Sequence, residues 1–349
     1  MKFCEIIEKE SWIILPKISV IMSTYNDSNY IRDAIRSILN QSFRDFEFII
    51  IDDASSDDTI KIIKEFADSR IRLFLNSENQ GLTKNLNKAL TLAMGEYIAR
   101  MDGDDISHLD RFQKQVEYLD SHPDVYLIGS AVHSFGASDL VWRLPDDSEE
   151  LKVRMLLRPV FAHPSFMFRK ALVNEGITYD ESFRTAQDYD FASRVAEKYK
   201  IGRIQDILLE YRIHQKQISR LAGENQISNA DRVRQRLFDN LGAKLCGEEK
   251  LIYSEWIVEK KLTSKKAYLK AYNIINAICK ANELSHIYDE DILEKVLKKM
   301  LYTWIIRSKD IAFVMSFPYF CRYSIRDMKI FVEEILRTIS EKRKGTHEN

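Results

Sequence analysis

Four apolar runs, each followed by a polar loop and a helix-like pattern, restrict the fold of this chain more than any other feature. The runs cover residues 18–22, 46–51, 71–75 and 97–99. They are apolar along most of their length and do not alternate with polar residues, which is typical of strands buried on both faces of a parallel sheet. We therefore expect an α/β fold, with a mostly parallel sheet flanked by helices and right-handed crossovers.

The polar loops that follow these four strands are expected to meet. They comprise residues 24–27, 52–58, 79–85 and 102–105. In open α/β sheets the carboxyl ends of parallel strands open on one edge, and ligands bind there. The sequence therefore predicts a binding site built from four loops that lie far apart along the chain.

The fourth loop carries Asp102, Asp104 and Asp105 around Gly103. Three carboxylates this close repel one another, so a cation between them would offset the cost of keeping them ionised beside a buried strand. Mg²⁺ and Mn²⁺ prefer oxygen ligands and often share them with substrate phosphates. Gly103 is expected to let the backbone bend between the outer ligands. A solvated acidic turn is the alternative interpretation.

Local signals place the neighbouring elements less firmly. Ser55 or Ser56 is expected to cap the helix that follows the second strand, and Ser107 with Asp110 is expected to form a capping box. Beyond residue 129 the regular alternation ends. Here the pattern favours a helix near 149–157, strands near 165–168 and 207–214, and a helix that opens at Gln187.

The length of 349 residues favours more than one structural region. We expect an N-terminal extension over residues 1–16, an α/β domain over 17–224, and a helical C-terminal region over 225–349. Residues 225–349 hold 23 Lys and Arg against 17 Asp and Glu, a net charge of +6, whereas residues 1–224 hold 29 against 36, a net charge of −7. The acidic balance of the motif-bearing part opposes a nucleic-acid-binding role.

Residues 300–331 interleave aromatic and basic side chains. Such a segment can lie against an anionic membrane surface, as a peripheral contact at the inner face. The alternative is a helical subdomain whose aromatic side chains form its core. No uninterrupted apolar run approaches the ~18 residues of a spanning helix, and charged residues interrupt the N-terminus, so a cytoplasmic protein is expected. The four cysteines are scattered without metal-like or disulfide-like spacing, which suits a reducing compartment.

With these loops in place, the sequence resembles the family 2 glycosyltransferases of the GT-A fold, which is Rossmann-like. The likeness covers about residues 17–220. It is carried, in this order, by Ile18-Ser19-Val20-Ile21-Met22-Ser23-Thr24-Tyr25-Asn26, Ile51-Asp52-Asp53-Ala54-Ser55-Ser56-Asp57, Asn79-Gln80-Gly81, Asp102-Gly103-Asp104-Asp105 and Gln187-Asp188-Tyr189-Asp190. The resemblance implies transfer of a sugar from a nucleotide diphosphate donor to a hydroxyl, with inversion at the anomeric carbon.

The same resemblance assigns a nucleotide-binding set. Asp53 would accept the imide hydrogen of a uracil, which implies a UDP-sugar, and Tyr25 would lie against the base. Asp102 would face the ribose or the metal. The complete set is Thr24, Tyr25, Asn26, Asp27, Asp53, Asn79, Gly81, Lys84 and Asp102.

The resemblance also implies the catalytic and metal-binding residues. Asp104 would ligate a divalent metal, Mn²⁺ or Mg²⁺, that bridges the diphosphate, and His214 would approach that metal. Asp188 would be the base that removes the proton of the acceptor hydroxyl. Gln187 departs from the Glu that the family more often has there. His163 would lie near the acceptor; for both histidines an ordinary structural imidazole is the alternative.

Asp105 and Asp190 are interpreted as helix caps or supporting partners of the site rather than catalysts. The function expected from these residues is sugar transfer to a glycan or lipid-linked acceptor in surface polysaccharide biosynthesis. One alternative is a nucleotidyltransferase, but the first loop lacks the glycine-rich, basic sequence of that class. The other alternative is a non-catalytic module that binds nucleotide sugars.

Overall fold

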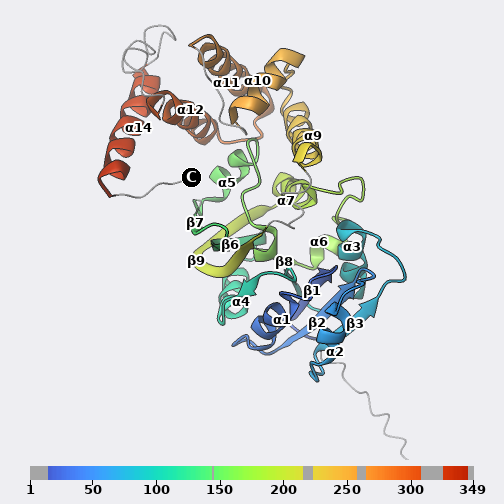
Figure 1. Ribbon diagram of the computed structural model, residues 1–349. Coiled ribbons are helices and arrows are strands. Elements are labelled where there is room, and N and C mark those ends of the chain that lie inside the picture. Colours follow the sequence, from blue (N-terminus) through green and yellow to red (C-terminus); the bar gives the residue numbers. More distant parts are fainter. Residues whose placement is uncertain (1–14, 144, 215–222, 258–264, 308–324, 345–349) are drawn as a thin grey trace, which may run out of the picture.

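The computed structural model describes residues 15–143, 145–214, 223–257, 265–307 and 325–344. Its α/β part and its C-terminal helices lie one above the other (Figure 1). Helices α5, α7 and α9 lie between the sheet below and helices α10, α11, α12 and α14 above.

The four predicted strands form one parallel half of the sheet. Their order is β3-β2-β1-β4, with parallel pairing throughout. The strands are β1 (Ile18–Thr24), β2 (Phe46–Asp52), β3 (Ile71–Leu75) and β4 (Tyr97–Arg100). The helices between them are α1 (Ile31–Leu39), α2 (Thr59–Lys64) and α3 (Leu82–Leu92). The expected order of elements over the first 120 residues is confirmed.

The other half of the sheet is mixed. Strand β8 runs antiparallel to β4 and to β6, whereas β9 runs parallel to β6 and antiparallel to β5. The described residues thus form a nine-stranded sheet. The strand expected near 207–214 is the end of the much longer β9. The additional strands are β5 (Ile106–Ser107), β6 (Val125–Gly136), β7 (Leu140–Trp142), β8 (Met167–Arg169) and β9 (Lys200–Ile213).

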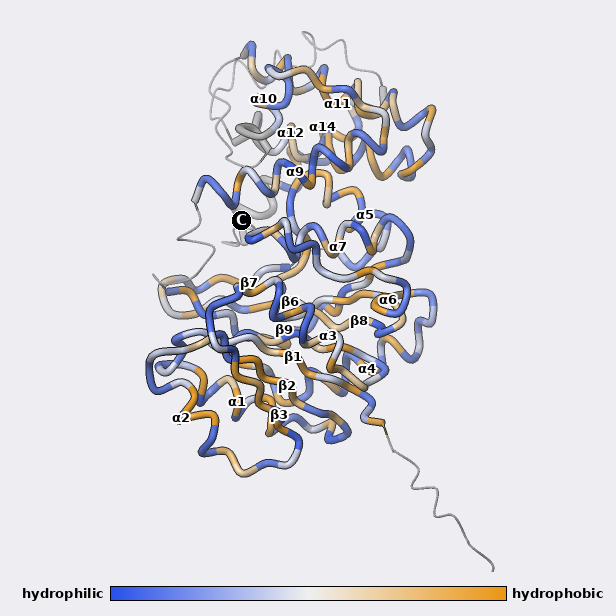
Figure 2. Tube along the Cα trace, turned by 90° about the vertical axis from the view of Figure 1, so that its right-hand side faces the viewer, coloured by the Kyte–Doolittle hydropathy of each residue, from blue (hydrophilic) through white to orange (hydrophobic). Residues whose placement is uncertain are grey.

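Two hydrophobic cores explain why the first strands are apolar on both faces. Val20 belongs to a core with residues of α1 and of α4 (Arg111–Ser121). Its neighbour Ile21 belongs to a larger core with α3, α5 (Ser148–Arg154) and α7 (Gln187–Lys198). Successive side chains of a strand point to opposite faces, so each run supplies both cores. The orange colour of β1 and β2 in Figure 2 marks this hydrophobic centre.

The C-terminal helices share the larger core with the sheet. Val233, Leu237 and Phe238 of α9 are buried in the cluster that contains Ile21. The aromatic rings of Tyr302 and Phe331 meet at 5.3 Å in an edge-on arrangement, so these two side chains of the aromatic segment are core. The helices are α9 (Gly223–Leu241), α10 (Gly247–Ile257), α11 (Lys265–Ser285), α12 (Glu290–Arg307) and α14 (Ile325–Lys344).

Residues 308–324 of the segment expected to contact a membrane lie outside the described residues, and the remainder of that segment belongs to α12 and α14. Among the helices that the structure describes, none combines the length and the apolar composition needed to cross a membrane.

Two predicted helix caps are wrong. Helix α2 begins without a serine cap; the carboxylate of Asp57 accepts the Thr59 N–H instead, at 3.0 Å. At the start of α4, Asp110 makes no side-chain capping bond, and the Ser107 hydroxyl accepts from Gln41 Nε2 at 3.1 Å. In both places the serine hydroxyl forms a hydrogen bond with a residue from another part of the chain. The local sequence pattern at the start of a helix cannot predict such a contact.

Candidate functional site

A cavity of about 1670 Å³ lies at the carboxyl ends of the parallel strands. All four predicted loops reach it, and the structure brings most of the predicted site residues together there. Those residues are Thr24, Tyr25, Asn26, Asp27, Asp53, Asn79, Gly81, Asp102, Asp104, His163, Asp188 and His214. Lys84 is the exception: its side chain is exposed on α3 and does not line the cavity. Its neighbours Thr83 and Asn85 are the buried residues of that turn.

Asp53 joins the ends of β2 and β3. Its Oδ1 accepts hydrogen bonds from Asn76 Nδ2 and the Gln80 N–H, and its Oδ2 accepts from the Gly81 N–H at 2.9 Å. These donors outweigh burial and lower the pKa of Asp53. Gly81 has φ +88°, a conformation that favours glycine. A carboxylate oxygen has two acceptor positions, so Oδ2 keeps one for a ligand.

The side chain of Asp27 forms hydrogen bonds within the first loop and lies against the fourth loop. Its Oδ2 accepts from the Thr24 hydroxyl at 2.8 Å and the Tyr25 N–H at 3.2 Å. Burial raises the pKa of Asp27 to about 6, and Asp104 adds to the rise while the Thr24 hydrogen bond opposes it. Because burial makes this carboxylate costly to ionise, a nearby cation would stabilise its ionised form.

The structure shows why position 103 is a glycine, and the reason differs from the predicted one. Its φ is not positive, so the turn does not need glycine for bending. A Cβ at this position would lie 2.7 Å from Asp27 Oδ2 and 3.3 Å from Ile31 Cδ1. The glycine is required because the first and fourth loops approach each other too closely for a side chain.

Asp102, Asp104 and Asp105 fit a divalent cation. One ligand atom from each lies within 4.8 Å of the others. Asp105 is buried; its Oδ1 accepts the Arg212 N–H at 2.8 Å, while its Oδ2 has no hydrogen-bond partner among the described residues. Burial, then Asp104 and Asp102, raise the pKa of Asp105 well above its ordinary value. An all-oxygen set with an unsatisfied buried oxygen is the chemistry that Mg²⁺ or Mn²⁺ prefers.

His214 lies beside this cluster at the end of β9. Its Nε2 is 2.8 Å from Asp104 Oδ2, and its ring meets that of Tyr30 at 5.0 Å. Arg212 donates from Nε to the Asp104 carbonyl at 2.8 Å. The end of β9 therefore supports the acidic loop, and His214, which was predicted to approach the metal, contacts the predicted metal ligand Asp104.

Arg100 is a cavity residue that the sequence analysis missed. It is buried at the end of β4 and forms an ion pair with Asp102, and its Nε has no hydrogen-bond partner among the residues that the structure describes. Burial alone would lower the pKa of Arg100, but the charge of Asp102 outweighs it and raises the pKa. The sequence did contain an indication: Arg100 is a charged residue at the end of an apolar strand, directly before the acidic loop.

Asp188 lies in the first turn of α7 and lines the cavity. Burial raises the pKa of Asp188, while the Tyr189 N–H and Arg100 counter the rise. Ala186 precedes the helix in a left-handed conformation with φ +56°. A carboxylate with a raised pKa at the edge of a cavity can accept a proton near neutral pH.

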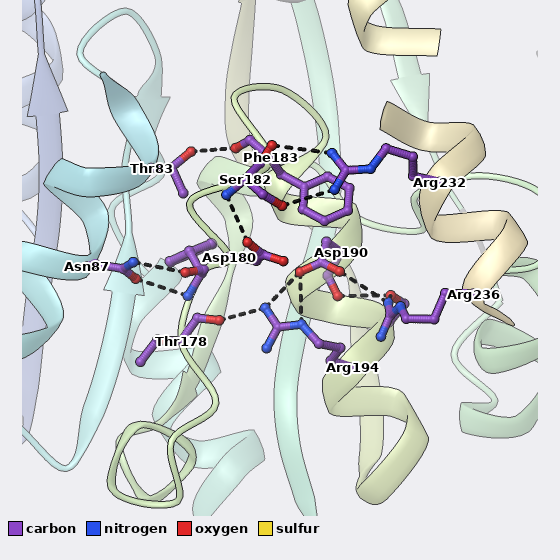
Figure 3. A network of polar contacts seen from close by, with 12 residues as sticks. Thr83, Asn87, Thr178, Asp180, Ser182, Phe183, Asp190, Arg194, Arg232 and Arg236 are labelled. Atoms are coloured by element: carbon purple, nitrogen blue, oxygen red, sulfur yellow. Dashed lines mark hydrogen bonds and ion pairs between the residues drawn. The ribbon is translucent and has the colours of Figure 1, made fainter. Parts of the chain in front are cut away.

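Asp190, two residues on, points away from the cavity into a polar network (Figure 3). It accepts from Arg194 Nε at 2.8 Å and forms an ion pair with Arg236 of α9 at 3.3 Å. Arg232, also of α9, donates to the Ser182 hydroxyl at 3.0 Å. The network fixes α7 to the C-terminal region, which agrees with the supporting role predicted for Asp190.

His163 lines the cavity but is largely buried. Its Nε2 lies 2.9 Å from the Tyr179 hydroxyl, and its ring packs edge-on against Phe166. Burial, with the charge of Arg100, lowers the pKa of His163 well below its ordinary value. The imidazole is therefore neutral at physiological pH.

Comparison with known proteins agrees with this geometry. The model of the family described as glycosyl transferase family 2 matches residues 19–177. An uncharacterized glycosyltransferase of Methanocaldococcus jannaschii is 36% identical over 207 residues, which are 57% of this chain and 71% of that protein. The O-antigen biosynthesis glycosyltransferase WbnJ of Escherichia coli is 32% identical over 219 residues, 60% of this chain and 84% of that one.

Solved structures agree on the fold. Residues 1–349 of S. aureus TarS, in complex with UDP-GlcNAc, superpose with a TM-score of 0.58 at 17% identity, covering 95% of this chain and 93% of that one. In the longer TarS structure this chain spans 54% of the length, with a TM-score of 0.54. The sheet, the loops at its edge and the relatives together show that this chain belongs to glycosyl transferase family 2 and has the GT-A fold.

Proposed function

We propose that this glycosyltransferase moves a sugar from a UDP-sugar to a hydroxyl of a glycan or lipid-linked acceptor, with inversion and with the help of a divalent metal. The observation that carries the proposal is that Asp104 and Asp188, 84 positions apart, line the same cavity from different loops. An in-line displacement needs the attacking and the leaving oxygen on opposite sides of one carbon, and therefore two separate groups.

The nucleotide end of the cavity belongs to the first three loops. Asp53 Oδ2, which has one acceptor position left, would take the imide hydrogen of uracil. Tyr25 is 49% exposed and offers its ring to the base. The Asn26 backbone is held by the Ser55 hydroxyl at 2.9 Å, so the first and second loops form one wall.

Asp102, Asp104 and Asp105 would hold the metal, with His214 beside Asp104. When bound, a divalent cation neutralises the charge that develops on the departing diphosphate. Arg100 pairs with Asp102 and orients that carboxylate toward the cavity.

Asp188 would take the proton of the acceptor hydroxyl as it attacks. Its raised pKa makes it a better proton acceptor than an exposed carboxylate. The N-terminus of α7 favours the ionised form before the proton arrives. His163, neutral and bonded to Tyr179, would shape the wall for the acceptor without carrying charge.

The printed descriptions of relatives support the donor and the pathway class. TarS is described in complex with UDP-GlcNAc, and WbnJ as an enzyme of O-antigen biosynthesis. By analogy, a uridine nucleotide sugar and a surface polysaccharide fit this chain. A peripheral contact with the inner membrane face is part of the proposal, because lipid-linked acceptors lie there.

The test is a panel of nucleotide sugars in which nucleotide release is measured with Mn²⁺, with Mg²⁺ and with EDTA. We expect release from a UDP-sugar that EDTA abolishes and either metal restores. Asp104→Ala should lose donor affinity and metal dependence together, whereas the control Asp33→Ala, at an exposed position of α1, should lose neither. Unchanged UDP titration in Asp104→Ala would overturn the metal assignment. Donor binding without any turnover would favour a non-catalytic binding module.

A further inference from the structure

The cavity has a second charged region that the proposed donor site does not use. Arg143, Arg154, Arg158 and Arg203 all line it. They come from the segment after β7, from α5, from the residues just beyond α5, and from β9. We call these four residues the arginine cluster. They come from separate elements, so the fold brings them together.

The four guanidinium groups are close enough to repel one another. Burial, then Arg143 and Arg154, lower the pKa of Arg203 to about 10. Burial and Arg154 lower the pKa of Arg158. Like charges held together in a partly desolvated wall cost free energy, and an anionic ligand between them removes that cost.

Protein groups neutralise the cluster only in part. Arg154 pairs with Glu150, while Arg143 and Arg203 donate to backbone carbonyls, of Gln205 at 3.0 Å and of Trp142 at 2.6 Å. Arg203 is 3% exposed, and its buried Nε has no hydrogen-bond partner in the described part of the chain. The side chain of Arg158 has no hydrogen bond or ion pair with any described residue, and its backbone N–H donates to the Arg154 carbonyl at 3.2 Å. Three of the four charges therefore lack a carboxylate partner.

The carboxylates that line the cavity belong to the proposed donor and metal site, apart from Asp188, the proposed base. They are Asp27, Asp53, Asp102, Asp104 and Asp188. The cavity is thus divided into an acidic region, where a cation and a diphosphate fit, and a basic region without a lining carboxylate.

The two regions are anchored at different positions along the sheet. Along β6, Arg203 pairs with Gly129 and Arg212, which bonds to the Asp104 carbonyl, pairs with Phe135. Six residue steps of a strand separate these main-chain positions by ~20 Å. We therefore expect the arginine cluster to receive an anionic group other than a diphosphate held at Asp104.

The wall between the regions fits a sugar chain. Leu140, Val141 and Trp142 of β7 all line the cavity and are 38%, 45% and 40% exposed. The Trp142 ring lies 5.2 Å from that of Tyr211, which also lines the cavity. Exposed aromatic and aliphatic surface beside charged groups is the lining expected for an amphipathic ligand such as a glycan.

We propose that the arginine cluster binds an anionic group of the acceptor, so that the acceptor is a glycan chain that bears phosphodiester or carboxylate groups. This inference rests on the proposed function, because that function identifies the bound chain as the acceptor. The anionic group lies about one to a few sugar units from the hydroxyl that is glycosylated, given the ~20 Å between the main-chain positions that anchor the two regions.

The test titrates the metal-free protein with three oligomers of equal length: phosphodiester-linked glycerol, oligogalacturonate and neutral maltooligosaccharide. We expect one or both anionic oligomers to bind more tightly than the neutral one, and the stronger of the two identifies phosphodiester or carboxylate. Arg158→Gln should weaken that binding about tenfold or more, and Arg158→Lys should restore part of it. Added NaCl should weaken binding to the wild-type protein more than to Arg158→Gln.

Arg36→Gln is the matched control, because Arg36 is exposed on α1 and does not line the cavity. The Arg158 side chain has no hydrogen-bond or ion-pair partner among the described residues, so its variant should fold as the wild type does. Equal binding of the neutral oligomer, or anionic binding that survives Arg158→Gln, would overturn the inference. Absence of turnover with every nucleotide sugar would instead count against the proposed function and leave the oligomer titration valid.

Discussion

Replacing Asp188 by Asn tests the assignment of the base with little change of shape. General-base assistance contributes ~10²–10⁴ to a rate, so the turnover number should fall by that factor, equivalent to about 3 to 5 kcal/mol in activation free energy. Donor affinity should change little, since Asp188 comes from α7 and not from the four loops that carry the proposed nucleotide and metal residues. The assay is nucleotide release under saturating UDP-sugar and acceptor, with the dissociation constant of UDP measured separately.

The stability of the same variant should move in the opposite direction from its activity. Burial raises the pKa of Asp188 in the folded state, so its ionised form costs folding free energy at any pH above that value. A neutral amide removes this cost, and the free energy of unfolding at pH 7 should stay equal or rise. Chemical denaturation measures it.

Asp190→Asn is the matched control on the same helix. Asp190 is buried, pairs with Arg194 and Arg236, and does not line the cavity. Loss of its charge removes one ion pair from Arg194 and one from Arg236, although Arg194 keeps the Thr178 carbonyl and Arg236 keeps Glu197, and should cost about 1 to 3 kcal/mol of stability. Turnover of the folded variant should stay within about tenfold of the wild type. Near wild-type turnover in Asp188→Asn, or a loss of activity matched by a loss of stability, would refute the reasoning.

Three further outcomes follow from the structure. Asp27→Asn should raise the free energy of unfolding at pH 8 in EDTA, and the gain should shrink between pH 6 and pH 4, because the folded pKa of Asp27 is about 6; denaturation at each pH measures this. Ala186→Gly should not destabilise the protein, since the left-handed conformation of Ala186 already costs about 1 kcal/mol; a loss above 1 kcal/mol in urea denaturation would contradict this. Truncation after residue 230 should give insoluble protein, because it removes Val233 and Phe238 from the shared core; a soluble fragment that binds UDP would show that the helical region is separable.

The sequence predicted that the first four loops meet at one cavity because each loop comes after a strand of the parallel sheet. Asp53 and Asp102 come immediately after apolar runs, so the topology of a parallel sheet alone brings them to one edge. Asp188 lies beyond the regular part of the chain. Its position was inferred from the family resemblance, and no local pattern would have placed it beside Asp104.

The arginine cluster was not predicted because its members share no motif and no period. Arg143 and Arg203 are 60 positions apart, and the bulged pairing of β6 with β9 brings their strands together. The mixed half of the sheet escaped prediction for the same reason: antiparallel neighbours such as β8 and β6 are set by tertiary packing, not by strand-helix alternation.

The backbone of the site explains why its loops depend on one another. Among the described residues, four positions other than glycine have positive φ, and three of them, Asn26, Ala54 and Ala186, adjoin or nearly adjoin Asp27, Asp53 and Asp188. Such conformations cost roughly 1 to 3 kcal/mol each and persist only where surrounding contacts determine them. For Asn26 those contacts are the hydroxyl of Ser55 and the N–H of Ser56, both from the neighbouring loop. Contacts from the second loop thus stabilise the strained backbone of the first loop at Asn26. A substitution at Asn26 is therefore expected to displace the neighbouring carboxylates of Asp27 and Asp53.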